Sequence, residues 1–371
     1  MIKLKKDVWV IKNIDEVCES IFAGGDVPKN SFSKTKTDKL TVPIFSNGEK
    51  DKGLFGYTDI EIVIKPSLTI SARGTIGYSE IREGRYYPAV RLIVLIPNIR
   101  IIDLFFLKIA ISNIDFASSG TSIPQLTVPM VKKYAIPLPP LDEQQRIVEL
   151  FQSIEQSIVQ AGKQEKNLHW LLHGLINDYT NPKSKYRKST LQKIRFGNVA
   201  QNISERIEPK DAIGQIFVGL EHLDPRDIAI RRFGKPDDLI GTKLKVYEGD
   251  IIFSKRNAYL RKAAVANFTG ICSAHAMVIR AIPEKIYKDF LPYFIHSDSF
   301  MARAKEISEG SISPTIKWKN LENQEFLIPS IEEQETISDL FIQIDQTCNL
   351  IREQKETLKK LKQKLLNEIL G

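Results

Sequence analysis

Two short segments of similar sequence carry the side chains best suited to contact with nucleic acid. They are Ser-Ala-Arg-Gly at 71–74 and Ser-Lys-Arg-Asn at 254–257, and each follows a run of strand-forming residues. An arginine delivered into a tight turn can donate two parallel hydrogen bonds to a guanine edge, whereas serine hydroxyls and backbone amides can hold phosphate. We therefore predict that Arg73 and Arg256 contact bases or phosphates. The alternative is a structural turn in which the arginine pairs with an acidic neighbour.

Other polar residues extend this predicted interface. The turn at 46–48 is followed by two lysines, and the second arginine segment is followed by a tyrosine and further basic residues. All of these groups can donate hydrogen bonds to phosphate or base edges. The candidate DNA-binding residues are Ser46, Asn47, Lys50, Lys52, Ser71, Arg73, Gly74, Arg91, Ser254, Lys255, Arg256, Asn257, Tyr259, Arg261 and Lys262.

No catalytic motif is apparent in the sequence. It lacks a Gly-x-x-x-x-Gly-Lys-[Ser/Thr] loop, and Asn-Pro-Lys at 181–183 lacks the aromatic residue that would stack a flipped base. Pro-Asp-Asp at 236–238 lacks the following carboxylate-x-lysine pair expected of a nuclease. His169 and His173 have ligand spacing on a helix, but no third ligand is apparent, and the Cys272-to-His275 stretch has the same weakness. We predict a non-catalytic protein without a metal site.

The composition favours a polyanionic partner. The net charge is +8 and the isoelectric point is about 9.1, while 42% hydrophobic and 26% charged residues are ordinary for a folded domain. The sequence has no uncharged apolar run of 18 residues, and its start lacks the apolar core of a signal peptide, so we expect a cytoplasmic protein. Cys18, Cys272 and Cys348 are scattered and predict buried hydrophobic side chains rather than disulfides.

The chain contains an internal repeat. The segments 118–124 and 308–314 are similar, as are 139–147 and 329–337, and both pairs have one offset of 190 residues (310 − 120 and 333 − 143). Upstream, the two arginine segments match each other, and Trp9 to Val17 resembles Leu191 to Val199 in pattern. A duplicated order of domain, helix, domain, helix follows.

Two segments, 140–182 and 330–371, have the hydrophobic spacing of long coiled-coil helices. Apolar residues recur in steps of three and four over a length of roughly 60 Å, which is not stable as a single helix in water. We expect the helices to pair antiparallel, with the domains at opposite ends. The alternative is that each helix packs on its own domain. The residues predicted for the coiled coil and for subunit docking are Glu143, Gln144, Ile147, Phe151, Ile154, Glu333, Gln334, Ile337, Phe341 and Ile344.

The remaining segments, 1–139 and 183–329, are predicted to be two mixed α/β recognition domains, so the fold class is α+β. Short strand patterns alternate with turn signals and a few helical patterns. The predicted strands are 41–45, 60–64, 68–70, 91–96, 214–219, 251–253 and 277–280, and the predicted helices are 104–111 and 291–296.

The Pro-Leu-Pro-Pro-Leu-Asp-Glu-Gln-Gln-Arg-Ile segment at 137–147 and its repeat at 328–337 resemble the specificity subunits of type I restriction-modification systems. The segment 71–77 is similar to a loop of that family's target-recognition domains. The resemblance extends over essentially the whole chain. It implies two target-recognition domains separated by an antiparallel coiled coil, and recognition of a bipartite DNA site with an unread gap. Because the two arginine segments differ, they are expected to read different half-sites.

The resemblance also implies partners. Such a subunit docks two methyltransferase subunits, which methylate adenine with S-adenosylmethionine, and restriction subunits that use ATP and Mg²⁺, while it needs no cofactor itself. Two alternatives remain open at this point. One is a coiled-coil scaffold without sequence-specific DNA binding, and the other is a specificity subunit of a related system in which methyltransferase and nuclease are fused.

Overall fold

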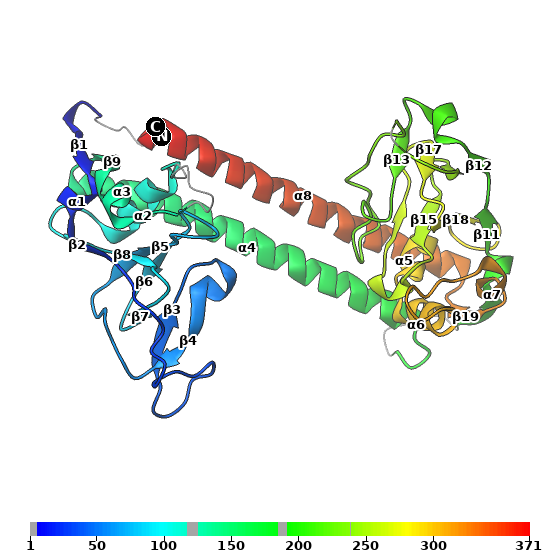
Figure 1. The fold of residues 1–371 in the computed structure, drawn as a ribbon. Helices are drawn as coiled ribbons and strands as arrows, with labels where there is room; N and C mark the ends of the chain where they lie inside the picture. Colours follow the sequence, from blue (N-terminus) through cyan, green and yellow to red (C-terminus); the bar gives the residue numbers. More distant parts are fainter. Residues whose placement is uncertain (1–5, 117–124, 185–190, 238) are drawn as a thin grey trace. The chain divides into compact units, whose positions relative to one another are not determined.

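The computed structural model describes residues 6–116, 125–184, 191–237 and 239–371. The chain forms two compact units: unit 1 comprises 1–161 with 354–371, and unit 2 comprises 162–353. Each unit combines small sheets with short helices and with one segment from each of two long helices (Figure 1). The α+β, two-domain fold class is therefore confirmed.

Unit 1 is built around a four-stranded antiparallel sheet in the order β2-β8-β5-β6. These strands are Cys18–Ala23, Ile93–Pro97, Ser67–Ile70 and Ser79–Arg82. A second sheet has the order β4-β3-β7, made of Leu54–Thr58, Val42–Phe45 and Tyr87–Pro88. The helical elements are η1 (Lys6–Val8), α1 (Ile14–Val17), η2 (Lys50–Gly53), α2 (Leu104–Ser112) and α3 (Val128–Lys133).

Unit 2 repeats the first arrangement. Its antiparallel sheet has the order β11-β18-β15-β16, formed by Ala200–Ile203, Ala276–Ala281, Ile251–Ser254 and Ala263–Val265. A second sheet, in the order β12-β14-β17-β13, contains Arg206–Ile207, Lys243–Val246, Gly270–Cys272 and Ile216–Val218. The helical elements are η3 (Phe196–Asn198), η4 (Pro209–Ala212), η5 (Ala258–Leu260), α5 (Phe290–Ile295), α6 (Asp298–Glu306) and α7 (Trp318–Leu321).

In each unit, the first strand pairs with the strand that immediately precedes a long helix to form a two-stranded ribbon. In unit 1, β1 (Val10–Asn13) pairs antiparallel with β9 (Ala135–Leu138). In unit 2, β10 (Gln192–Arg195) pairs in the same way with β19 (Glu325–Ile328). Together with the matching four-stranded sheets, the ribbons support the internal duplication. The repeated segment 118–124 lies outside the described residues.

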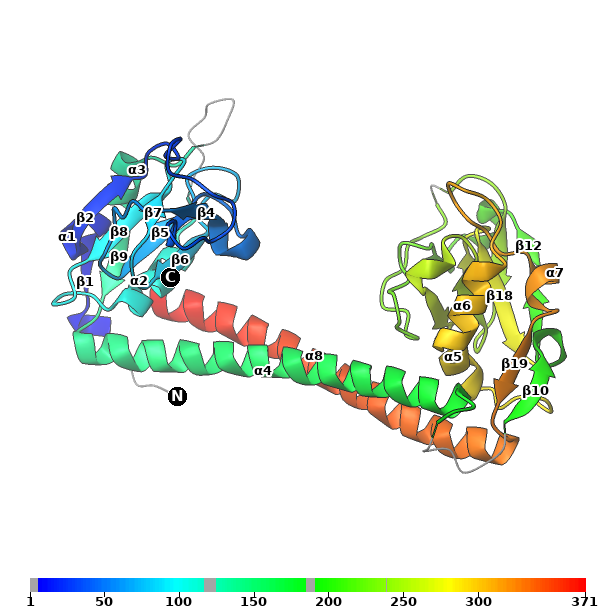
Figure 2. The same ribbon diagram turned by 90° about the horizontal axis from the view of Figure 1, so that it is seen from below.

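The long helices are α4 (Leu141–Thr180) and α8 (Ile331–Leu370), where the sequence predicts 140–182 and 330–371. In unit 1, the start of α4 shares a core with the end of α8 through Phe151 and Leu366. In unit 2, the end of α4 shares a core with the start of α8 through Ile176 and Phe341. Within each unit the two helix segments therefore pack antiparallel, as both ribbon views show (Figures 1 and 2).

The helix starts also pack on the body of their own unit, so the buried residues given below serve the core and the paired helices and are not exposed for subunit docking. Gln144 is fully buried, accepts from the Asp103 amide at 2.8 Å and donates to the Pro139 carbonyl at 2.8 Å. Gln334 does the same with Tyr287 and Pro329, both at 2.9 Å. Glu143 accepts from Trp9 Nε1. The apolar side chains are likewise buried: Ile147, Phe151, Ile154, Ile337, Phe341 and Ile344. Such residues hold the unit together and cannot form a surface for another subunit.

One predicted strand is wrong. The segment 60–64 alternates apolar and polar residues, but only an isolated bridge joins Val63 to Tyr86, and Ile60, Ile62 and Ile64 are exposed. Val63, between the isoleucines, is the residue that reaches the core. In the part of the chain that is described, no helix has the length and apolar character needed to cross a membrane.

Candidate nucleic-acid interface

The two arginine segments occupy equivalent places in the fold. Each connects the two strands of a hairpin at one edge of a four-stranded sheet, β5–β6 in unit 1 and β15–β16 in unit 2. The hairpins are closed in the same way, because the Ser71 amide donates to the Tyr78 carbonyl at 2.8 Å and the Ser254 amide donates to the Lys262 carbonyl at 2.9 Å. The repeat therefore presents two arginines from the same position of two similar sheets.

In unit 1, neighbouring side chains brace the loop. Asn47 Oδ1 accepts from the Ala72 amide at 2.7 Å, and Asn47 Nδ2 donates to the Val90 carbonyl at 2.7 Å. The buried Ser71 hydroxyl accepts from the Gly48 amide at 3.1 Å. Asn47 and Ser71 thus position the loop, which corrects their prediction as direct contacts.

Arg73 remains exposed at the tip of this loop. Its Nε and Nη2 donate to Gln125 Oε1 at 3.2 and 2.6 Å. Because this partner is a neutral amide, Arg73 is not paired with an acidic neighbour, which was the alternative prediction. Gly74 follows with φ +71° and open space where a Cβ would stand. The guanidinium charge is uncompensated by this contact and available to an anion.

The other candidates in unit 1 lie on nearby turns. Lys52 forms an ion pair with Glu80 at 3.3 Å, and Lys50 is exposed on the same short helix, η2. Ser46 is partly buried, and its amide donates to Gly53. Arg91 is exposed at φ +59° in a turn beside Val90, whose carbonyl binds Asn47. The structure therefore joins the Asn47 turn, the Arg91 turn and the Arg73 loop through Asn47.

In unit 2, the backbone of another segment braces the loop. The Asn257 amide donates to the Pro314 carbonyl at 2.8 Å, and the Ile316 amide donates to the Lys255 carbonyl at 2.9 Å. Asn257 has φ +53°, a left-handed conformation that asparagine tolerates better than most residues. The loop is consequently docked along residues 314–316, where the repeated motif at 308–314 ends.

Two predicted contacts of this loop are structural instead. The Ser254 hydroxyl is buried and donates to the Arg256 carbonyl at 2.8 Å. Arg261 pairs with Asp298 at 2.6 Å and donates to the His296 carbonyl at 2.8 Å, while Lys262 donates to the Leu220 carbonyl at 2.8 Å. Ser254 and Arg261 are thus engaged within the unit, so the prediction is corrected for these two, whereas Lys262 uses only one of its three N–H donors. Tyr259 is exposed, as an interface residue requires.

A basic groove adjoins Lys255. The cavity has a volume of about 440 Å³ and is lined by residues from several strands and loops, among them Arg206, Lys243, Lys255, Lys317 and Trp318. Burial lowers the pKa of Lys255, and nearby Arg206 lowers it further. Burial also lowers the pKa of His275, with added repulsion from Arg256, Lys255 and Lys243. The four cationic side chains that line the groove therefore lie close together.

Little negative charge opposes this cluster. Within the described ranges, Arg206, Lys243, Lys255 and Arg256 form no ion pair with a carboxylate, whereas Lys317 pairs with Glu309 at 2.6 Å. A cluster of unpaired cations is a binding surface for a polyanion. The sequence did not indicate Arg206, Lys243 or His275, because only the folded sheets bring them beside the loop.

The residues considered as metal ligands serve other purposes. His169 lies 3.3 Å from Arg352, and His173 lies 3.4 Å from Asp298. Cys272 is buried, and burial raises the pKa of its thiol to about 12. Across the described residues, no group of three or more His, Cys, Asp or Glu side chains has an arrangement that would hold a metal ion.

Taken together, the fold and the loops define a class: a duplicated α+β protein that carries one arginine loop at the equivalent hairpin of each of two units. The model of the type I restriction modification DNA specificity domain matches residues 6–168 and 237–360, more than half of the chain. The chain belongs to this family, and the resemblance predicted from the sequence is confirmed.

Named relatives agree with this assignment. The type I restriction enzyme MjaVIII specificity subunit of Methanocaldococcus jannaschii is 24% identical over 293 residues, which cover 72% of this chain and 68% of that protein. The Mycoplasma pneumoniae protein S.MpnORF89P, named as a type I specificity subunit, is 37% identical over 134 residues, or 36% of this chain. That match spans 39% of the length of the Mycoplasma pneumoniae protein.

Two solved structures share the fold. The S subunit of a type I restriction-modification system from M. genitalium superposes with a TM-score of 0.62 at 15% identity, covering 100% of this chain and 98% of that one. A structure from work on complex assembly and conformational transition of the type I R-M system gives 0.59 at 18% identity, with 97% of both chains covered. At these identities the likeness is one of fold.

Proposed function

We propose that this chain is the non-catalytic, sequence-reading subunit of a cytoplasmic type I restriction-modification complex, and that each unit reads one half of a bipartite DNA site. The observation that carries the proposal is the cluster of unpaired cations around Lys255 and Arg256, together with the equivalent exposed Arg73. Basic surfaces of this kind bind DNA by releasing counterions, and arginines on them read guanine in the major groove.

The proposed order of events follows from these contacts. Lys243, Lys255 and Arg206 attract phosphates without regard to sequence. Arg73 and Arg256 then test base edges from their braced loops, so that sequence affects the lifetime of the complex. Because the loops are Ser-Ala-Arg-Gly and Ser-Lys-Arg-Asn, the half-sites differ.

The internal repeat supports docking of two copies of one partner, because it places similar surfaces at two equivalent positions. Exposed apolar residues stand at equivalent positions of the long helices: Leu171 and Leu361 are 51% and 43% exposed, and Leu141 and Ile331 are 44% and 41% exposed. We propose that these replace the buried residues predicted from sequence as contacts for two methyltransferase subunits. S-adenosylmethionine would act on those subunits, and ATP with Mg²⁺ on the restriction subunits, with none required by this chain.

The first test measures binding of the full chain to a fluorescent duplex at several salt concentrations. We expect the logarithm of the association constant to fall linearly with the logarithm of salt concentration, with specific duplexes favoured over random ones. A chain that ignores all duplexes in moderate salt would instead be a scaffold.

A second test concerns the gap. We propose that α4 and α8, each of which contributes a segment to both units, set the unread spacing. Inserting seven helical residues into each helix adds roughly 10 Å, or about three base pairs, to the gap and leaves both half-sites unchanged. An unchanged gap in a footprint would refute this role of the helices.

A further inference from the structure

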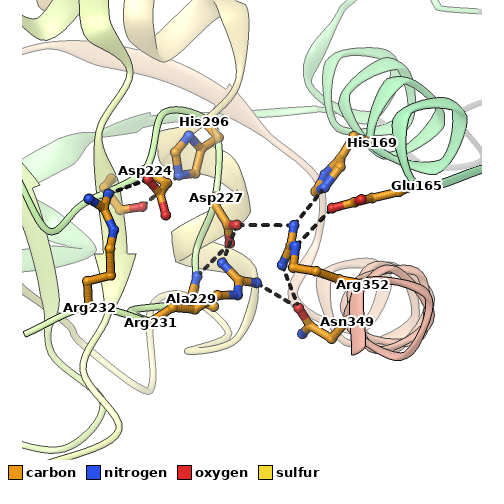
Figure 3. Close-up of polar contacts among 11 residues, drawn as sticks. Glu165, His169, Asp224, Asp227, Ala229, Arg231, Arg232, His296, Asn349 and Arg352 are labelled. Atoms are coloured by element: carbon orange, nitrogen blue, oxygen red, sulfur yellow. Dashed lines mark hydrogen bonds and ion pairs between the residues drawn. The ribbon is translucent and has the colours of Figure 1, made fainter. Parts of the chain in front are cut away.

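Unit 2 contains a second cavity that the recognition loop does not use. It has a volume of about 550 Å³, in the range of small-molecule sites. Its walls come from α4 at 169–176, from the loop at 224–232, from His296 and from Arg352 of α8. Figure 3 shows the polar side chains of this region, with Asp227 of the 224–232 loop facing Arg352 of α8.

One wall of the cavity is a saturated ion-pair network. Arg352 Nε donates to Glu165 at 2.8 Å, and its Nη2 lies 3.7 Å from Asp227. Arg231 pairs with the same Asp227 and donates to Asn349 Oδ1 at 2.6 Å, as Figure 3 shows. Because these side chains are hydrogen-bonded and ion-paired with one another, they form a structural part of the cavity wall.

Two polar groups of the cavity are not satisfied in this way. Arg226 makes no side-chain hydrogen bond or ion pair with any described residue, and its backbone is held at φ +60° by the bond from its amide to the Arg261 carbonyl. A non-glycine residue in this conformation is strained, and such strain is common where a side chain must be aimed. The lining thus has four arginines against two aspartates.

The second unsatisfied group is His296, which is 4% exposed. Its Nε2 lies 2.9 Å from the Ala263 carbonyl, which can only accept, so Nε2 carries the proton. Burial lowers the pKa of the ring to about 4, which keeps it neutral at pH 7. Nδ1 is therefore a buried acceptor, and it has no hydrogen-bond partner.

An aromatic and apolar surface completes the cavity. Trp170 is 63% exposed although it lines the cavity, and Leu172, Ile176 and Pro225 form the apolar part of the wall. An exposed indole offers a face on which a nucleobase can stack.

Several residues that line the cavity are not repeated in unit 1. At the offset of 190 residues, Arg352 corresponds to Gly162, Trp170 to Lys360 and His173 to Gln363. A feature of one copy of a duplicated protein is not required by the shared fold, so the cavity residues are free to serve a function of their own.

We propose that this cavity binds a nucleoside monophosphate unit, with the phosphate on Arg226 and the base stacked on Trp170. The unit could be a free nucleotide or an unstacked nucleotide of a DNA strand, since both present the same groups. The inference does not depend on half-site reading by the loops.

The test titrates dAMP, orthophosphate and a short single-stranded oligonucleotide into the full chain by calorimetry. We expect one saturable site for dAMP or for the oligonucleotide, weakened at least tenfold in Arg226→Gln and in Trp170→Leu, because a charge-assisted contact or a stacking face is lost. Arg303→Gln is the matched control, since Arg303 pairs with Glu306 on α6 and does not line the cavity.

The two sources are distinguished in the same series. Saturable dAMP binding identifies a free nucleotide. Binding of the oligonucleotide alone, with 2-aminopurine in a duplex brightening in the parent chain but not in Arg226→Gln, identifies a nucleotide of DNA. The proposal is overturned if neither ligand binds, if orthophosphate binds as tightly as dAMP, or if both variants bind as the parent does. Intact duplex recognition alongside these failures would leave the proposed function standing.

Discussion

The recognition loops of the two units hold the same position in the sheet but are braced differently. In unit 1, one asparagine side chain, Asn47, ties the loop to two neighbouring turns. In unit 2, backbone hydrogen bonds to Pro314 and Ile316 brace the loop, and Asn257 adopts a left-handed conformation. The duplicated fold thus fixes where each arginine emerges, while the local support and sequence have diverged. Under the proposed function, this divergence lets two units of one architecture read different DNA half-sites.

The units also differ in titratable groups. All five histidines of the chain lie in unit 2, and one of them, His296, is buried and neutral. Mild acid should therefore destabilise unit 2 before unit 1. This difference gives the first way to test the comparison.

The largest predicted effect is the loss of stability in acid. The pKa of His296 is about 4 in the folded chain against an ordinary 6.5, so between these values the unfolded chain binds the proton and falling pH favours unfolding. The expected loss is on the order of 3 kcal/mol by pH 4. Denaturant melts across pH should show this slope, and His296→Gln should remove most of it. If the free energy of unfolding of His296→Gln fell with pH as steeply as that of the parent chain, protonation of carboxylates would account for the loss of stability.

Next in size is the effect of removing an arginine that we propose contacts DNA. Arg256→Ala should lower affinity for the cognate duplex by roughly 10- to 100-fold, the usual value of a bidentate base contact, with unchanged thermal stability. Arg261→Ala is the matched comparison on the same loop, because it removes the ion pair with Asp298 and the hydrogen bond to the His296 carbonyl and should lower the melting temperature. If Arg256→Ala and Arg261→Ala lowered the melting temperature equally, Arg256 would have a structural role like that of Arg261.

A smaller effect tests the two modes of bracing. Asn47→Ala removes two hydrogen bonds and should cost about 1–2 kcal/mol of stability in unit 1. Asn257→Gly should be close to neutral, since glycine tolerates φ +53° and no side-chain bond is lost. Chemical denaturation of both variants checks this, and a larger loss for Asn257→Gly would contradict the assignment.

The smallest predicted change concerns salt dependence. Lys255→Ala should lower the slope of binding against salt by about one and weaken all duplexes alike, as loss of a phosphate contact does. Lys319→Ala, an exposed lysine of α7 that does not line the basic groove, should leave the slope unchanged. A sequence-dependent loss in Lys255→Ala would show that this lysine reads bases.

Much of this architecture could be predicted from the sequence where local pattern determines structure. The heptad spacing predicted both long helices to within two residues at each end, and the repeat placed Arg73 and Arg256 on equivalent hairpins. The alternation at 60–64 misled because a strand needs partners, and this segment has only the bridge at Val63.

The site was harder to predict because it depends on contacts distant in sequence. Gln144 and Gln334 are polar residues at helix starts, yet the unit buries them to satisfy backbone groups. The cluster of Arg206, Lys243 and His275 forms only when β12, β14 and the loop before β18 meet around the Lys255 loop. The charge composition indicated a basic protein, but it could not show which basic residues lie together in the folded unit.

The most direct test of the account selects binding sites from a randomised duplex library with the parent chain, Arg73→Ala and Arg256→Ala. The account predicts a bipartite consensus in which each variant relaxes a different half and leaves the other half and the gap intact. A single contiguous consensus, or loss of the same positions in both variants, would contradict the claim that two equivalent loops read two separate half-sites.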